Sequence, residues 1–394
     1  MKMELAFPTI DDYRTRLLRL QKAIRESGFD VLALSSFDNH RFLGGVDGIA
    51  TVRPVWVIVP ADGEPVFVSP RIEAPEIRQQ SWIPVAQEWI EWEEEGVPRS
   101  AIEAVVRVLE PFGGAARIGV DYDATSAASL EALRAALGAE RIADATPLVR
   151  EVRKVKDQAT IDVVRRSADI AVHQFRATVA VAAAGVAEWE VVRASRDAAI
   201  ERAAYWWNGD IEHSPLLQGI HVLGSGAERS SRAHAVGAGR MMEDGDVLQV
   251  SYCGRPFFGH GICFDRPVQV GDSALSADVL RVVRVARAAQ EAALDRIRPG
   301  VTTGQVHQAA IEAIEAAGLP SALRHRTGRG IGLSDPEWPE IKAGDPTVLE
   351  TGMIIGIEPG VYVEGVTGAR FGDTVLVTDT GFEPLTPLEL GREF

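Results

Sequence analysis

The chain has 394 residues, 46% of them hydrophobic, and its 56 acidic and 41 basic residues give a formal net charge of −15. This length suffices for two domains with large cores, while the acidic surface disfavours binding to nucleic acid. No run of about 18 apolar residues or apolar signal core occurs, and two cysteines are too few for a disulfide framework, so we expect a cytoplasmic protein with no membrane partner.

Residues 10–150 alternate helical and strand patterns. The segment Tyr13–Arg25 places leucines among charged residues, which is typical of a surface helix. Short apolar runs predict strands at 30–35, 55–60, 65–68 and 117–121. Further helices are expected at 100–112 and 126–137. Ala-Asp-Gly at 61–63 is a hairpin signal, and together these elements predict a mixed α/β domain over residues 1–155.

A charged segment at 147–156 precedes a long Ala- and Val-rich helical pattern over 159–184, and we place a domain boundary there. Helices are then predicted at 187–204, 275–297 and 303–317. Strands are predicted at 219–224, 247–253, 261–270, 353–358 and 371–378. A pattern of two helices with a pair of strands occurs twice, which predicts an internally duplicated α+β domain over 156–394.

The most informative stretch runs from His325 to Thr386 and reads HRTGRGIGL, then LETGMIIGIEPGVYVEG, then GARFGDTVLVTDTGFEPLT. This frame resembles the last third of the pita-bread superfamily, which includes aminopeptidase P, prolidase, methionine aminopeptidase and creatinase. The resemblance is strong over 156–394 and only architectural before that. It implies an α+β protein in which a mixed α/β domain precedes a C-terminal pita-bread catalytic domain.

In the metallopeptidases of that superfamily, two Asp, one His and two Glu hold two metal ions. The resemblance places four of these five positions at Ser251, Ile262, Arg329 and Gly372. Glu358, in IEPG, keeps the fifth ligand. Transition metals need several converging N, O or S donors, and Arg329 would put a fixed positive charge at the metal position. A new site at His260, Cys263 and Asp265, which lie close in sequence, is the alternative, but their spacing matches no familiar ligand pattern. We therefore expect no metal ion and no other cofactor.

Creatinase, a metal-free member, supplies a second resemblance. The segment GHGICFDR at 259–266 aligns with its corresponding strand, so that Asp265 and Glu358 fall where creatinase has two substrate-binding Glu. His234, in RAHA, falls at the position of its proton-shuttling His. The chemistry is independently reasonable, because a His with a pKa near 6.5 can accept a proton from water and return it to a leaving nitrogen. We predict catalytic roles for His234, Glu358 and Asp265.

Each of these residues has a structural alternative. His234 could be an ordinary surface or core histidine. Glu358 could be a structural partner of an arginine, either Arg329 or Arg370. Asp265 could form a local ion pair with the neighbouring Arg266. Carboxylates are rarely buried unpaired, so the surroundings of Glu358 in its apolar strand decide between these interpretations.

Substrate-binding candidates lie in both domains. Arg329 favours an anionic substrate group, such as a carboxylate. Arg53, in TVRPVW, resembles an arginine that in creatinase reaches into the partner subunit's site, which implies a homodimer; the alternative is a surface strand residue. Trp206 and Trp207 are placed in a loop near the pocket, although such pairs more often fill core or dimer contacts. His260, which lies close to Asp265 in the sequence, is the last substrate-binding candidate.

We predict a metal-independent hydrolase of the creatinase type, acting on a C–N bond in a small amino-acid-like or osmolyte-like molecule. A lyase acting on a small zwitterion, a non-catalytic binding or scaffold member, and an Xaa-Pro peptidase-type metallohydrolase are the alternatives. The lost ligands argue against the peptidase. Convergence of His234, Asp265 and Glu358 on one cavity would favour the enzyme, and scattered, solvated side chains would favour the binding protein.

Overall fold

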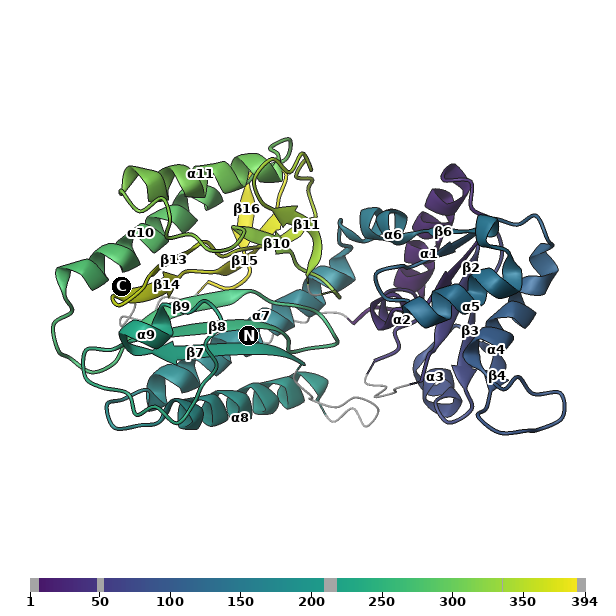
Figure 1. Cartoon of the computed structure of the whole chain (residues 1–394), viewed down its shortest axis with the longest axis horizontal. Helices are drawn as coiled ribbons and strands as arrows, with labels where there is room; N and C mark the ends of the chain where they lie inside the picture. The colour runs from purple at the N-terminus through teal and green to yellow at the C-terminus, as the bar shows by residue number, and fades with distance from the viewer. Residues whose placement is uncertain (1–6, 48–52, 209–217, 335, 388–394) are drawn as a thin grey trace. The chain divides into compact units, whose positions relative to one another are not determined.

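The computed structural model describes residues 7–47, 53–208, 218–334 and 336–387. The chain divides between Arg153 and Lys154 into two compact units, drawn together in Figure 1. Within the described ranges, no helix is both long and apolar enough to cross a membrane.

The N-terminal unit is built on a six-stranded mixed sheet with the strand order β4-β3-β2-β1-β5-β6. The strands are β1 (Val31–Leu34), β2 (Trp56–Pro60), β3 (Val66–Pro70), β4 (Val85–Trp89), β5 (Ile118–Val120) and β6 (Ile142–Asp144). The helices are α1 (Ile10–Glu26), α2 (Phe37–Gly44), α3 (Ala74–Gln80), α4 (Ala101–Leu109), α5 (Ala127–Leu137) and α6 (Thr146–Arg153). Strand β1 pairs antiparallel with β2 and parallel with β5, so the sheet is mixed as predicted.

The C-terminal unit contains the helices α7 (Gln158–Val181), α8 (Glu188–Trp207), α9 (Gly226–Ser230), α10 (Ala277–Leu294) and α11 (Thr303–Ala316). A three-stranded sheet consists of β7 (Gln218–Ser225), β8 (Val247–Arg255) and β9 (Phe264–Gln269). A five-stranded sheet has the order β11-β10-β12-β15-β16. Its strands are β10 (Gly328–Gly330), β11 (Glu337–Ile341), β12 (Ile354–Ile357), β15 (Asp373–Val377) and β16 (Phe382–Pro384). The hairpin of β13 (Gly360–Val363) and β14 (Thr367–Arg370) completes the unit.

Two helix pairs cover the strands of this unit (Figure 1). Helices α7 and α8 lie against β7–β9, and α10 and α11 lie along the strands that follow β9. In the first core Phe175 meets Phe264 edge-on, with ring centroids 5.2 Å apart. The second core packs Val283 and Ala286 with Val375 and other buried residues of β12–β15. A pair of helices packed against strands thus occurs twice, which is the duplicated α+β arrangement that the sequence predicts.

The end of α8 differs from the prediction. The sequence places Trp206 and Trp207 in a loop, but both lie in the last turn of the helix, which Asn208 caps in the left-handed conformation (φ 52°). The helix continues this far because Trp207 is buried against Phe257, with ring centroids 4.4 Å apart. Burial of this large ring therefore extends the helix beyond the predicted end.

Candidate functional site

A cavity of about 270 Å³ opens among the strands of the C-terminal unit. It is lined by Val222, His234, Ser251, Cys253, His325, Arg326, Arg329, Pro336, Glu358 and Arg370. Strands β7 and β8 of the three-stranded sheet supply three of these residues, while β10 of the five-stranded sheet and β14 of the hairpin each supply an arginine. Most are polar or charged, so the cavity suits a small polar molecule.

Strand β8, which lines the cavity with Ser251 and Cys253, pairs with β9 behind it. The two strands are antiparallel with Ser251 opposite Asp265, and side chains two residues apart on a strand face the same side. The thiol sulfurs of Cys253 and Cys263 and the carboxylate oxygens of Asp265 and Glu358 all lie within 4.8 Å of one another. These four groups form a compact cluster of titratable side chains.

The pairing register also corrects one sequence interpretation. The resemblance placed a lost ligand position at Ile262, but Ile262 belongs to the apolar core, as does Phe264 two residues later. The side chains that reach the site are those of Cys263 and Asp265. The residue directly opposite Ser251 in the β8–β9 pairing is Asp265, so a count of residues from Ser251 along the chain selected the wrong position.

Glu358 and Arg329 form a buried ion pair on the cavity wall. Strand β10 pairs with β12, so Arg329 comes beside Gly356, and Glu358 follows the end of β12. The Nη1 of Arg329 donates to Oε1 of Glu358, and the Cys253 thiol donates to Oε2 at 3.6 Å. Burial by itself would raise the pKa of Glu358, but the guanidinium groups of Arg329 and Arg370 outweigh it and lower that pKa to about 2. Glu358 is therefore a carboxylate of low basicity.

Asp265 lies behind the cavity wall and does not line it. Its carboxylate accepts a hydrogen bond of 2.8 Å from Nε of Arg370 and one of 3.5 Å from the Cys263 thiol. Complete burial raises the pKa of Asp265, and the adjacent Arg370 acts in the opposite direction. The alternative pairing with Arg266 is wrong, because that guanidinium binds Asp373 at 2.8 Å. Asp265 therefore holds Arg370, which does line the cavity.

His234 reaches the cavity from the segment after α9. That segment is held by the buried carboxylate of Glu188, which accepts hydrogen bonds from Nε of Arg229 at 3.0 Å and from the backbone N–H of Ala238 at 3.1 Å. His234 itself is exposed on the cavity wall. The structure thus brings His234, Arg329 and Glu358 into one cavity, as the sequence predicts.

His325 and Arg326 also line the cavity, and the sequence analysis did not select them. Burial, followed by the charge of Arg370, lowers the pKa of His325, so its ring is neutral at pH 7. Its Nδ1 lies 2.8 Å from the carbonyl oxygen of Arg326 and so carries the proton, leaving Nε2 to accept from the Tyr362 hydroxyl at 2.9 Å. The sequence signal that could have identified them is their position directly before the TGRG motif.

The remaining predicted binding residues lie elsewhere. Trp206 donates from Nε1 to Asp169 at 2.7 Å, and Trp207 packs in the core with Phe257. His260 is buried, with Nδ1 2.6 Å from the carbonyl oxygen of Phe258. Among the residues that the structure describes, none of these three lines the cavity, so we correct their assignment to packing roles. Aromatic residues that lie close to a site in the sequence can pack in a helix interface instead of contacting a ligand.

Arg53 belongs to the N-terminal unit. Its Nη2 lies 2.8 Å from Oε2 of Glu91, and the side chain is about one-third exposed, at 34%. That hydrogen bond and the charge of Glu91 raise the pKa of Arg53. The expectation that Arg53 serves a partner subunit's site remains a prediction.

The donors near the cavity do not fit a two-metal cluster. Both carboxylates are held by guanidinium groups, Ser251 offers a hydroxyl, and Gly372 offers no side chain. The hydrogen bond to Cys253, followed by burial, raises the pKa of Cys263, which keeps its thiol protonated. A divalent ion would have to displace Arg329 and Arg370 from their partners and remain beside both positive charges. We therefore derive no chemical step through a metal ion.

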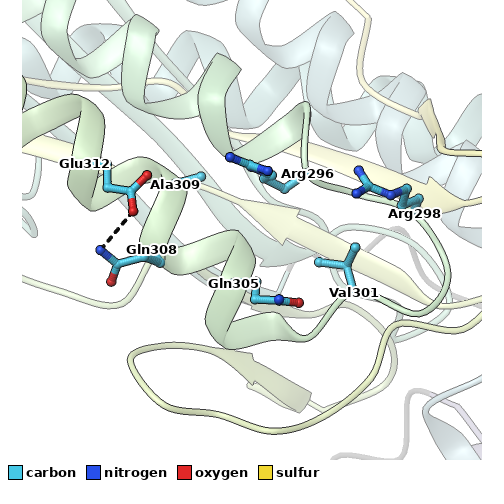
Figure 2. Close-up of a pocket in the computed structure, with 7 residues that line it drawn as sticks. All are labelled: Arg296, Arg298, Val301, Gln305, Gln308, Ala309 and Glu312. Atoms are coloured by element: carbon cyan, nitrogen blue, oxygen red, sulfur yellow. Dashed lines mark hydrogen bonds between the residues drawn. The ribbon is translucent and has the colours of Figure 1, made fainter.

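A second cavity, of about 220 Å³, lies along α11 (Figure 2). It is lined by Arg296, Arg298, Val301, Gln305, Gln308, Ala309 and Glu312. Figure 2 shows the Gln308 amide donating to Glu312, a contact of 3.3 Å. The lining residues include no histidine or cysteine and no buried ion pair, so the first cavity is the candidate active site.

Comparison with known proteins identifies the family. Residues 162–379 match metallopeptidase family M24, and residues 16–155 match the creatinase/prolidase N-terminal domain. The agropine synthesis cyclase of Rhizobium rhizogenes is 47% identical over 395 residues, which is 98% of each chain. Dipeptidase PepE from Mycobacterium ulcerans is 28% identical with a TM-score of 0.83 over 98% of each chain. The prolidase from Pyrococcus horikoshii OT3, 20% identical, shares the fold with a TM-score of 0.80 over 96% of this chain and 99% of that one. The predicted fold is thereby confirmed, and the chain belongs to metallopeptidase family M24, with a creatinase/prolidase N-terminal domain before its pita-bread domain.

Proposed function

We propose that this protein is an enzyme that closes or opens a ring in a small amino-acid-like molecule, with His234 as the proton shuttle and without a metal ion. The single observation that carries the proposal is the cavity that His234 shares with the Arg329–Glu358 ion pair. It combines a group that can transfer protons at neutral pH with fixed charges that can orient a zwitterion. The 47% identical relative, named for cyclisation in agropine synthesis, supports a ring-forming reaction.

Ring closure is close in chemistry to the C–N bond hydrolysis that the sequence predicts. In hydrolysis the attacking group is water, and in ring closure it is another group of the same molecule. In both directions His234 accepts the proton of the attacking group and returns it to the leaving group. Glu358, with a pKa of about 2, is too weak a base for this step and instead accepts substrate N–H groups and balances the arginines.

Two other functions have less support. An Xaa-Pro dipeptidase of this family would require side chains that bind two metal ions. The donor groups around Asp265 and Glu358 do not fit such a cluster. A non-catalytic binding protein would not require a histidine to share a cavity with a buried carboxylate. His234 and Glu358 do share one, although Asp265 lies behind its wall.

The test is incubation of the purified protein with agropine, with and without a strong chelator, followed by mass spectrometry. Ring opening adds the mass of one water, and the reverse incubation, with the water-opened product, removes it. We expect conversion that the chelator does not abolish and that His234→Ala greatly slows. Conversion of a Gly-Pro dipeptide that depends on added Mn²⁺ or Co²⁺, with no change in agropine, would favour the peptidase and contradict the proposal.

A further inference from the structure

We infer that Arg326 is the residue that binds a carboxylate group of the substrate on the cavity wall. The sequence assigned that role to Arg329, and the structure moves it to another arginine of the same motif. The inference rests on the proposed function for the meaning of the cavity, and its test does not depend on turnover.

Three arginines line the cavity, and two of them are already neutralised. Arg329 is paired with Glu358 and Arg370 with Asp265, and the side chains of these two arginines are only 7% and 3% exposed. Each of these guanidinium groups therefore uses its charge within the protein. Binding a substrate anion to either would compete with a buried partner.

Arg326 is in a different situation. Its side chain is 34% exposed, and its ion-pair partner, Glu340, lies 3.6 Å away and also binds Lys342. The Nε of Arg326 is buried without a hydrogen-bond acceptor among the residues that the structure describes. A guanidinium with a distant, shared counter-charge and an unused buried donor is the least satisfied charged group of the cavity.

The overall charge of the cavity favours an anion at this place. Glu358 is its only lining carboxylate among the described residues, Asp265 lies behind the wall, and His325 is neutral. Arg329 and Arg370 each have a carboxylate partner, whereas Arg326 and Lys342 share the single carboxylate of Glu340, so the excess positive charge lies on the Arg326 side of the cavity. A planar guanidinium binds a carboxylate through paired hydrogen bonds, and a cavity of about 270 Å³ has room for an amino-acid-sized molecule.

Cys253 offers a direct test, because its half-buried thiol lines the same cavity. Iodoacetate and iodoacetamide alkylate a thiol by the same reaction, in which the sulfur displaces iodide, but only iodoacetate carries a carboxylate. We would measure both rate constants at Cys253 by mass spectrometry of the labelled peptide. Their ratio cancels changes in the reactivity of the thiol itself, and glutathione supplies the ratio for a free thiol.

We expect the protein to favour iodoacetate relative to glutathione, and Arg326→Gln to lower the ratio by about fivefold or more, as expected for loss of a charge-assisted hydrogen bond. Arg326→Lys, which keeps the positive charge but cannot form the paired hydrogen bonds of a guanidinium, should give an intermediate ratio. Arg324→Gln is the matched control, because Arg324 is exposed in the same segment and does not line the cavity. Cys253→Ser confirms the labelled position.

An unchanged ratio in folded Arg326→Gln would overturn the inference, and so would a Cys253 that neither reagent reaches. If that variant does not fold, Arg326→Lys and the salt dependence of the wild-type ratio decide, because salt screens an exposed charge and should lower the preference for iodoacetate. A clear preference without conversion of agropine would support the carboxylate site and refute the proposed function. Conversion of agropine without a preference for iodoacetate would support the proposed function and refute the carboxylate site.

Discussion

The carboxylate of Asp265 fills the space that any side chain at position 372 would need. A Cβ added at Gly372 would lie 1.8 Å from Oδ2 of Asp265, and the two residues also exchange backbone hydrogen bonds of 3.0 and 3.1 Å. The family resemblance assigns position 372 to a metal-binding Glu. The position of Asp265 in its buried ion pair with Arg370 is therefore compatible with glycine at position 372 and not with a larger side chain.

Gly372→Ala should destabilise the protein by at least about 2 kcal/mol, because the new methyl group must displace a buried, paired carboxylate. Urea unfolding followed by circular dichroism measures the loss. Gly239→Ala is the control, since a Cβ there would meet no atom within 4 Å. Equal stability of the two variants would show that Asp265 does not occupy this space.

His234→Ala should reduce the conversion of agropine by about 10²–10⁴-fold, the usual effect of removing a general acid–base group. The midpoint of thermal unfolding should change little, because His234 is exposed. His173→Ala on α7, which does not line the cavity, should keep its rate. A His234→Ala variant with wild-type turnover would remove the proton shuttle from the mechanism.

Elemental analysis of the purified protein should find Mn, Co, Zn and Fe well below one atom per chain, because guanidinium groups hold both carboxylates of the site. Extensive chelation should leave the turnover unchanged. One zinc per chain that Cys253→Ser removes would instead identify a site at the four clustered donors. That result would overturn the metal-independent mechanism.

The free energy of unfolding should fall as the pH decreases from 4.5 towards 2. Glu358 has a pKa of about 2 in the folded protein against an ordinary 4.5, so its contribution to stability is complete above pH 4.5 and is lost as the pH falls to the folded-state pKa, because the unfolded chain takes up the proton first. This one group accounts for up to about 3 kcal/mol. Denaturant unfolding at a series of pH values measures the slope.

Glu358→Gln should flatten that slope and destabilise the protein at neutral pH, because Arg329 then remains buried without its carboxylate. Glu315→Gln, an exposed change on α11, should keep the wild-type slope. The same slope in Glu358→Gln and the wild type would mean that other carboxyl groups cause the acid sensitivity.

The sequence by itself determined the fold class and the family frame. Hydrophobic periodicity depends on local spacing, so the long helices and most of the strands were predicted close to their observed bounds. The motifs around Arg329 and Glu358 and the position of His234 were enough to place all three in one cavity. These residues lie in three separate segments, so the resemblance to the superfamily is what named them without coordinates.

Only the tertiary structure decided which neighbouring residue faces the site and which charges are already paired. Tertiary packing buried Ile262 in the core and brought the Cys263 thiol into the cluster with Cys253, Asp265 and Glu358, and burial drew Trp207 into a helix interface. The pairing of Arg370 with Asp265 left Arg326 as the least neutralised arginine of the cavity. Burial and charge pairing join residues far apart in the chain, and no local pattern records them.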